Sequence, residues 1–286
     1  MKIAFLGFGE AARAFVQNWT DGAKAQTCGF DVKSGDPSHG MTKIYADYQI
    51  LEQSTAADAV ADADVIFSLV TADQAIVAAR SAQGLKKGAM FLDCNSVSPG
   101  TKTENAKTIE DAGGLYTDVA VMAPVYPALN TVPLLLSGPH ARAASDILKA
   151  LTMNPTVVEG EVGYASSIKM IRSIMVKGME ALSAECALAA VAAGIDDRVL
   201  ASLSKSFPGM NWADQIAYNL ERMSVHGPRR AAEMAESAKT IAELGLPNTV
   251  TQGTVAWQDR IGRLGYRPTS ENYKNIAQDI LALLKK

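Results

Sequence analysis

The sequence predicts an α/β protein, with a doubly wound parallel sheet in its first half and an all-helical domain after it. Over the first 160 residues, short apolar runs such as "KIAFLGF", "VIFSLVT" and "AMFLDCN" alternate with helix-like segments, which is the pattern of βαβ units. The runs are apolar at nearly every position, as strands covered on both faces of a sheet require. After "TVVEG" strand-like runs disappear, and residues 163–284 have helical spacing.

The chain length and this change of pattern predict two domains. A chain of 286 residues is long for a single core. We expect a sheet domain over residues 1–160 and a helical domain over residues 161–286, joined by a long helix at about 163–193. Breaks at "AAGID", "SFPGMNW", "HGPRR", "LGLPN" and "LGYRP" divide the helical part.

The composition excludes several classes of protein. Apolar residues make up 48% and charged residues 20% of the chain, which is an ordinary globular balance. The net charge is −3, whereas proteins that bind phosphate backbones carry an excess of basic residues, so we expect no nucleic-acid partner. No apolar run reaches the roughly 18 residues of a membrane helix, so we expect no membrane partner either.

The cysteines point to a reducing compartment. Cys28, Cys94 and Cys186 are odd in number and widely spaced, which favours free thiols in the cytoplasm. No metal-ligand spacing is present, so no metal site is expected. The apolar run after Met1 is too short for a signal peptide. We therefore expect a cytoplasmic protein.

The segment "GFGEAA" ends the first strand-like run and opens a helix. Its G-x-G-x-x-A pattern provides a glycine for a tight turn, a glycine that lets backbone approach a pyrophosphate, and a small residue for close helix packing. The helix N-terminus directs N–H groups at the phosphates. The alternative is a glycine turn that binds nothing. The residues expected to contact a dinucleotide are Gly7, Phe8, Gly9, Glu10, Ala11 and Ala12.

Asp31 bears on which dinucleotide is bound. It closes the second strand-like run, where a carboxylate takes the ribose hydroxyls of the adenosine. Because a carboxylate repels a 2′-phosphate, the sequence favours NAD, with NADP left open. Lys33 could partly offset this repulsion, although a solvated loop lysine is the simpler interpretation.

Polar residues gather in "DCNSVSPG", directly after another strand-like run. We expect Asn95 and Ser96 at the carboxyl edge of the sheet, where open α/β sheets bind ligands. Turn and cap chemistry is the alternative for both. For Ser98, which precedes Pro99, an N-cap is the preferred interpretation.

The long helix carries cations on an otherwise apolar surface. At helical spacing one narrow stripe holds Ser166, Lys169, Ser173, Lys177 and Glu180, with Arg172 at its edge. A stripe this narrow favours a helix that lines a cleft. The alternative is a partly buried helix whose cations reach solvent or pair with Glu180 and Glu185, which explains Lys177 better than Lys169.

A second cationic segment, "HGPRR", is expected in a loop that opens a helix. His226 and Arg230 could hold a carboxylate. An arginine paired with Glu233 one turn later is the alternative.

In their order, "GFGEAA", "DCNSVSP", "YTDVAVMAP" and "GYASSIKMIRS" resemble the β-hydroxyacid dehydrogenases, which include 3-hydroxyisobutyrate and 6-phosphogluconate dehydrogenases. The resemblance spans roughly the first 180 residues. It implies a Rossmann domain that binds NAD(P), a catalytic lysine on the interdomain helix, and a homodimer. Lys169 falls on the family's lysine, Val70 and Thr71 on a loop along the cofactor, and Asn95 and Ser96 beside the nicotinamide.

Two departures indicate a divergent branch. The family's substrate loop normally ends in Ser-Gly-Gly, which is here Met122, Ala123 and Pro124. The asparagine one turn after the lysine is replaced by Arg172 and Ser173. Both changes, with the altered helical domain, put the family's familiar small substrates in doubt.

The resemblance predicts an NAD(P)-dependent oxidoreductase that transfers hydride between the nicotinamide and the carbinol carbon of a β-hydroxy acid or related alcohol, aromatic alcohols included. Lys169 is the expected acid/base, activated by burial beside Arg172 and Lys177. The remaining open alternatives are an imine reductase, a lysine-dependent lyase acting by decarboxylation or retro-aldol cleavage, and a non-catalytic dinucleotide sensor. The expected substrate-binding residues are Asn95, Ser96, Met122, Arg172, Ser173, His226 and Arg230.

Overall fold

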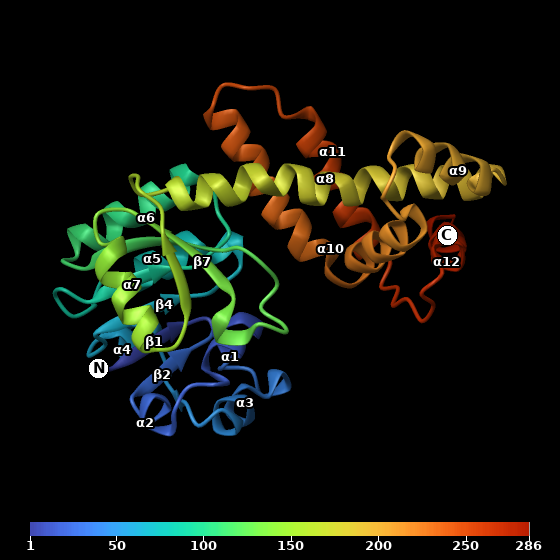
Figure 1. Ribbon diagram of the computed structural model, residues 1–286. Coiled ribbons are helices and arrows are strands. Elements are labelled where there is room, and N and C mark those ends of the chain that lie inside the picture. The colour runs from blue at the N-terminus through green and yellow to red at the C-terminus, as the bar shows by residue number, and fades with distance from the viewer. Residues whose placement is uncertain (286) are drawn as a thin grey trace. The chain divides into compact units, whose positions relative to one another are not determined.

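The computed structural model describes residues 1–285, which form two compact units, Met1–Met170 and Ile171 onward. The first unit contains the sheet and the second contains helices only (Figure 1). The boundary between them falls inside the long helix α8 (Tyr164–Ala193). The sequence pattern places the division earlier, at residue 160, before that helix begins.

One eight-stranded sheet, in the order β3-β2-β1-β4-β5-β6-β7-β8, forms the centre of the first unit (Figure 1). Its first six positions have the strand order of dinucleotide-binding folds, and the predicted fold class is confirmed. The two-residue strand β3 was not predicted. The strands are β1 (Ile3–Leu6), β2 (Thr27–Phe30), β3 (Leu51–Glu52), β4 (Val65–Ser68), β5 (Met90–Asp93), β6 (Leu115–Val121), β7 (Pro133–Ser137) and β8 (Asn154–Val157).

The pairing of β6 with β7 departs from the predicted parallel pattern. These two strands are antiparallel, with Val119 opposite Leu136, whereas every other pair in the sheet is parallel. The connection between them contains only the 3-10 helix η3 (Leu129–Thr131). A parallel pairing needs a crossover of about a dozen residues or more, usually helical, and this connection lacks such a helix.

Helices cover both faces of the sheet because alternate strand residues point to opposite sides. Ile3 and Phe5 of β1 belong to a buried cluster that includes residues of helices α1, α3 and α7, whereas Ala4 and Leu6 belong to another that includes residues of α4, α5 and α6. The helices of this unit are α1 (Glu10–Val16), α2 (Asp21–Lys24), α3 (Met41–Asp47), α4 (Ala56–Val60), α5 (Ala75–Ser81), α6 (Pro99–Asp111) and α7 (Ala141–Ala150), with short 3-10 turns η1 (Pro37–His39) and η2 (Ala72–Gln74).

The second unit packs its helices around an apolar core that includes Leu188, Leu220, Met223, Ile261 and Ile276. The predicted breaks at "AAGID", "SFPGMNW", "LGLPN" and "LGYRP" each fall between helices. Besides the C-terminal part of α8, the helices are α9 (Asp196–Ser206), α10 (Trp212–Glu243), α11 (Thr249–Gly262) and α12 (Tyr273–Leu284).

The predicted loop at "HGPRR" is wrong, because this segment lies inside α10. A Cβ on Gly227 would lie 2.3 Å from the carbonyl oxygen of Gln258, and a Cβ on Gly262 would lie 2.7 Å from the Cα of Gly227. The Gly-Pro pair that reads as a helix break therefore marks the point where α10 and α11 cross with their backbones in close contact. Pro228 removes one N–H from the helix but does not end it.

Over residues 1–285, no helix combines the length and apolar character that a membrane crossing needs.

Candidate active site

The glycine loop after β1 has the geometry that a dinucleotide site requires. Gly7 has φ +86, and a Cβ there would lie 2.5 Å from the carbonyl oxygen of Leu69, so only glycine fits. Gly9 is the N-cap of α1, and a Cβ added to it would meet nothing within 4 Å. Ala12 is fully buried under the sheet. The loop backbone at Gly9 is therefore open to a pyrophosphate.

Asp31 lies at the end of β2, beside this loop. One oxygen of its carboxylate accepts the backbone N–H of Phe8 at 2.9 Å, and the other accepts the N–H of Lys33 at 3.0 Å. The Phe8 ring is buried and stacks on Tyr45 at a centroid distance of 4.5 Å. The Phe8 side chain is therefore part of the core, and its backbone N–H is already bound to Asp31.

The Asn95 side chain, just after β5, forms hydrogen bonds to the end of the neighbouring strand β4 and to the loop that follows it. Its amide oxygen accepts the N–H of Val70 at 2.7 Å, and its amide nitrogen donates to the Ser68 hydroxyl at 2.8 Å. Asn95 is buried, whereas Val70 is half-buried and lies next to Gly7. Thr71 occupies the N-cap position of η2 without a side-chain capping bond. The Asn95 amide thus holds the segments after β4 and β5 together, and both its oxygen and its nitrogen have hydrogen-bond partners.

Ser96 and Lys169 meet although they are 73 positions apart in the chain. The ammonium nitrogen of Lys169 donates to the Ser96 hydroxyl at 2.6 Å. Both residues are half-buried. Ser98, in contrast, caps α6 by accepting the N–H of Thr101 at 3.3 Å. The amine of Lys169 and the hydroxyl of Ser96 are thus together just beyond the end of β5.

A fully buried polar cluster lies under this pair and was missed from the sequence. Lys102 of α6 donates to Asp93 at 3.0 Å and lies 3.3 Å from Asp118. Burial alone would lower the pKa of Lys102, but Asp93 and Asp118 outweigh it and raise that pKa. Burial also raises the pKa of the nearby Tyr116 phenol and brings that of the Cys94 thiol to about 12.

A signal for this cluster is present in the sequence. Lys102, Ala106 and Ile109 fall on one face of α6, so the spacing places a lysine on the face that packs against the sheet. Asp93 ends the otherwise apolar strand β5, and Asp118 is followed by three apolar residues in β6. A buried cation between two buried acids is the arrangement that such a pattern indicates.

The predicted residues of the helical unit are held by partners inside that unit. Arg230 is buried and binds the carboxylate of Glu180 through two guanidinium nitrogens, one of them at 3.0 Å. Lys177 lies 2.9 Å from Glu233. Arg230 therefore pairs with Glu180 of α8, and Lys177 pairs with Glu233 of α10 instead of with Glu180 or Glu185, the two partners considered for it from the sequence.

The remaining predicted residues differ in exposure. Ser173 is buried and accepts from Lys177 at 3.4 Å, whereas Arg172 is exposed on α8. His226 is half-buried within α10. Met122, at the end of β6, donates its backbone N–H to Pro133 at 2.9 Å and is half-buried.

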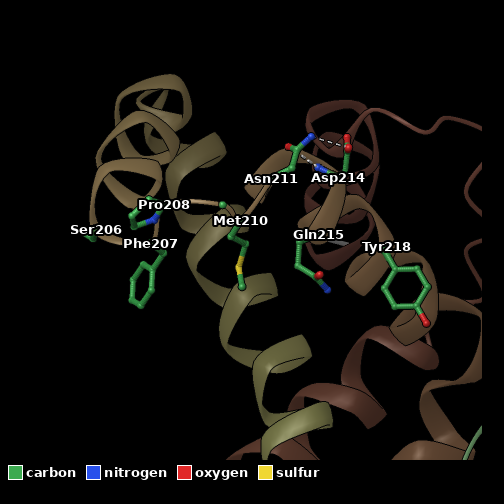
Figure 2. A pocket seen from close by; sticks show the side chains of 9 residues that line it. Ser206, Phe207, Pro208, Met210, Asn211, Asp214, Gln215 and Tyr218 are labelled. Carbon is green, nitrogen blue, oxygen red and sulfur yellow. Dashed lines mark hydrogen bonds between the residues drawn. The ribbon is translucent and has the colours of Figure 1, made fainter.

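A hollow of about 810 Å³ lies where α9 connects to α10 (Figure 2). Phe207, Met210 and Tyr218 contribute its apolar lining. The Asp214 carboxylate accepts the amide of Asn211 at 2.6 Å. None of the residues predicted for the site lines this hollow.

The sheet unit therefore combines a glycine loop, a carboxylate at the end of β2 beside that loop, and an amine hydrogen-bonded to a hydroxyl at the carboxyl edge of the strands. Among residues 1–285, no three His, Cys, Asp or Glu side chains are grouped so that they could hold a metal ion. This set of groups can bind a dinucleotide and exchange a proton with a nearby ligand hydroxyl.

Known protein families match both parts of the chain. The family described as NAD binding domain of 6-phosphogluconate dehydrogenase matches residues 2–160, and a domain of unknown function matches residues 190–261. A solved structure of a conserved hypothetical protein from Sinorhizobium meliloti 1021 is 34% identical, covers 99% of this chain and 96% of that chain, and has a TM-score of 0.77.

Two similar proteins are named as dehydrogenases. Human mitochondrial 3-hydroxyisobutyrate dehydrogenase is 27% identical over 174 residues, which is 58% of this chain and 51% of that enzyme. The structure of Mycobacterium tuberculosis 3-hydroxyisobutyrate dehydrogenase with L-serine covers 98% of both chains with a TM-score of 0.72. The sequence identity between these two chains is 17%, so this second match shows the fold alone.

Proposed function

The chain belongs to the family described as NAD binding domain of 6-phosphogluconate dehydrogenase, and on that premise we propose that it is an NAD-dependent oxidoreductase acting on the carbinol carbon of a β-hydroxy acid or related alcohol. The observation that carries this proposal is the 2.6 Å hydrogen bond between Lys169 and Ser96. It places an amine at the carboxyl edge of a sheet whose glycine loop is open to a dinucleotide.

In this proposal Lys169 is the general acid/base. When bound, the nicotinamide accepts or supplies the hydride. Lys169, in its amine form, takes the proton of the substrate hydroxyl during oxidation and returns it during reduction. Ser96 fixes the amine through their hydrogen bond and offers a second polar group to the same hydroxyl.

The activation expected from the sequence needs one revision. The charge of Lys177, which was expected to act on Lys169, is paired with Glu233 at 2.9 Å. An ion pair has a much weaker field than a lone charge. Lys177 is therefore no longer part of the proposed mechanism.

Asp31 supports NAD as the preferred cofactor. Its carboxylate is held by the N–H groups of Phe8 and Lys33, so it stays at the ribose end of the loop. Lys33 is exposed, as expected of a solvated loop lysine. A fixed carboxylate accepts the two ribose hydroxyls and repels a 2′-phosphate.

The test is the Lys169→Met variant, which removes the amine and keeps much of the side-chain volume. We expect NADH to bind as in the wild type, measured by its fluorescence, while turnover of hydroxy acids falls by about a thousandfold, within the range of general acid/base catalysis. Lys43→Met, which removes an exposed lysine of α3, is the control. Wild-type turnover with unchanged pH dependence in Lys169→Met would exclude the acid/base role.

The same assay separates the competing functions. A panel of 3-hydroxy acids, aryl diols and imines is followed at the nicotinamide absorbance, and products are identified by mass spectrometry. Turnover of imines alone indicates an imine reductase, and a product shortened by carbon–carbon cleavage indicates a lyase. NADH binding without turnover of any compound indicates a non-catalytic sensor.

A further inference from the structure

Two buried aspartates lie side by side in the sheet, and one lysine joins them. Asp93 of β5 and Asp118 of β6 are register partners on parallel strands, and both are 0% exposed. Two carboxylates this close in a dry interior repel each other strongly. Lys102, also 0% exposed, lies 3.0 Å from Asp93 and 3.3 Å from Asp118, and donates to the Asp93 carbonyl at 2.5 Å.

Asp93 holds the segment that carries Ser96. Its carboxylate accepts the backbone N–H of Asn95 at 3.0 Å, one residue before Ser96. The Tyr116 hydroxyl at 2.7 Å and the Asn105 amide at 3.0 Å also donate to this carboxylate. Asp93 is therefore anchored from three sides and fixes the turn after β5.

Asp118 holds the start of the helix that carries Lys169. Its carboxylate accepts the backbone N–H of Ser166 at 2.9 Å and the Ser166 hydroxyl at 2.6 Å. Ser137 donates to the same carboxylate at 3.1 Å and accepts the N–H of Ala165 at 2.9 Å. Because Lys169 follows Ser166 by three residues on α8, both lie on the same side of the helix.

We propose that Lys102 is a positioning residue, which sets the contact between Ser96 and Lys169 by joining the two aspartates that anchor them. The inference rests on the proposed function, because it assigns a purpose to that contact. The Lys102 ammonium contacts the two aspartates, so it affects the reaction only through them. We call the contacts of Lys102 with Asp93 and Asp118 the bridge. Loss of the bridge frees the turn after β5 and the first turn of α8 to move apart.

The test compares Lys102→Met with Lys107→Met. Both residues lie on α6, but Lys107 is exposed and pairs with Asp111 at 2.7 Å on the surface. In Lys102→Met we expect amide hydrogen exchange at residues 93–98 and 164–169 to become at least about tenfold faster. Turnover should fall by about ten- to a hundredfold at unchanged NADH affinity and substrate KM. Lys107→Met should match the wild type in all of these.

Should Lys102→Met fail to fold, Ser166→Ala decides the question. This variant removes only the 2.6 Å hydroxyl contact with Asp118, and we expect faster exchange at 164–169 with reduced turnover. Unchanged exchange in both segments, or unchanged turnover despite faster exchange, would overturn the positioning role. If the wild type turns over no substrate, the proposed function fails, whereas the exchange measurement still tests the bridge.

Discussion

The carboxylate of Asp31 accepts the backbone N–H of Phe8 at 2.9 Å, and this bond ties the end of β2 to the glycine loop after β1. In the proposed function the loop backbone would face the pyrophosphate of a dinucleotide and the end of β2 its ribose. The bond between Phe8 and Asp31 would then hold these two parts of the proposed cofactor site in place relative to each other. Preorganisation of this kind reduces the free energy spent on ordering during binding.

Replacing Asp31 with alanine should weaken NAD binding and shift preference toward NADP. The variant loses the charged acceptor for the ribose hydroxyls, which we expect to weaken NAD binding by about ten- to a hundredfold. It also removes the repulsion of a 2′-phosphate, so the affinity for NADP should fall less than the affinity for NAD. Calorimetric titration of both cofactors measures this, with Asp36→Ala on the exposed loop as the control. A wild type that prefers NADP would contradict the assignment.

The two loop glycines should respond differently to alanine. At Gly7 the left-handed backbone and the 2.5 Å approach to Leu69 oppose any Cβ, so Gly7→Ala should lower the free energy of unfolding by about 2 kcal/mol or more. At Gly9 there is space for a Cβ, so Gly9→Ala should retain stability and lose NADH affinity. Thermal unfolding and NADH fluorescence measure the two effects. Equal destabilisation by both substitutions would contradict this account.

The sequence predicts the periodic features of this fold well. The helix expected at about 163–193 is α8 (Tyr164–Ala193), because a long amphipathic pattern between clear breaks leaves little choice. Strand runs that are apolar at nearly every position also identify the covered sheet. The glycine loop is recognisable because steric limits at Gly7 admit one residue type.

Partner choice among charged side chains could not be predicted in this way. Lys177 pairs with Glu233 and Arg230 with Glu180, and each pair joins residues from two helices. Such pairs depend on how α8 and α10 pack, which the sequence does not specify. The crossing of α10 and α11 was also misread, because the Gly-Pro pair at the close backbone contact of Gly227 resembles a helix break. Lys102 was overlooked for a related reason, because its partners lie on two strands that become neighbours only in the folded sheet.

Arg230 should prove to be a stability residue of the helical unit. It is buried against Glu180, which also accepts the amide of Gln258 at 2.8 Å. Removing one member of a buried pair leaves the other charge unpaired, so Arg230→Met should lower the free energy of unfolding by about 3–5 kcal/mol. Urea unfolding measures this.

The matched control for that prediction removes both charges. In Arg230→Met/Glu180→Leu no buried charge is left without a partner, so most of the lost stability should return. A single variant that keeps its stability but loses affinity for an acidic substrate would instead support the substrate-binding role predicted for Arg230 from the sequence.

One side of α8 within the helical unit carries exposed apolar residues at heptad spacing. Ile171, Met175 and Leu182 are 47%, 68% and 66% exposed. Together with Gly178 they follow one another at intervals of four, three and four residues. Intervals of this kind form a seam that packs against another helix. Contiguous exposed apolar surface of this kind is typical of interaction sites.

A second copy of the chain is the partner we expect on this seam, because a two-fold dimer pairs the same surface with itself. Leu182→Glu places a charge at the seam, so it should convert a dimer into a monomer without unfolding the chain. Sedimentation equilibrium measures the mass, and circular dichroism monitors the fold. Val77→Glu, at a 56% exposed residue of α5, is the control and should remain dimeric. A wild-type protein that sediments as a monomer at all concentrations would show that the seam serves another purpose.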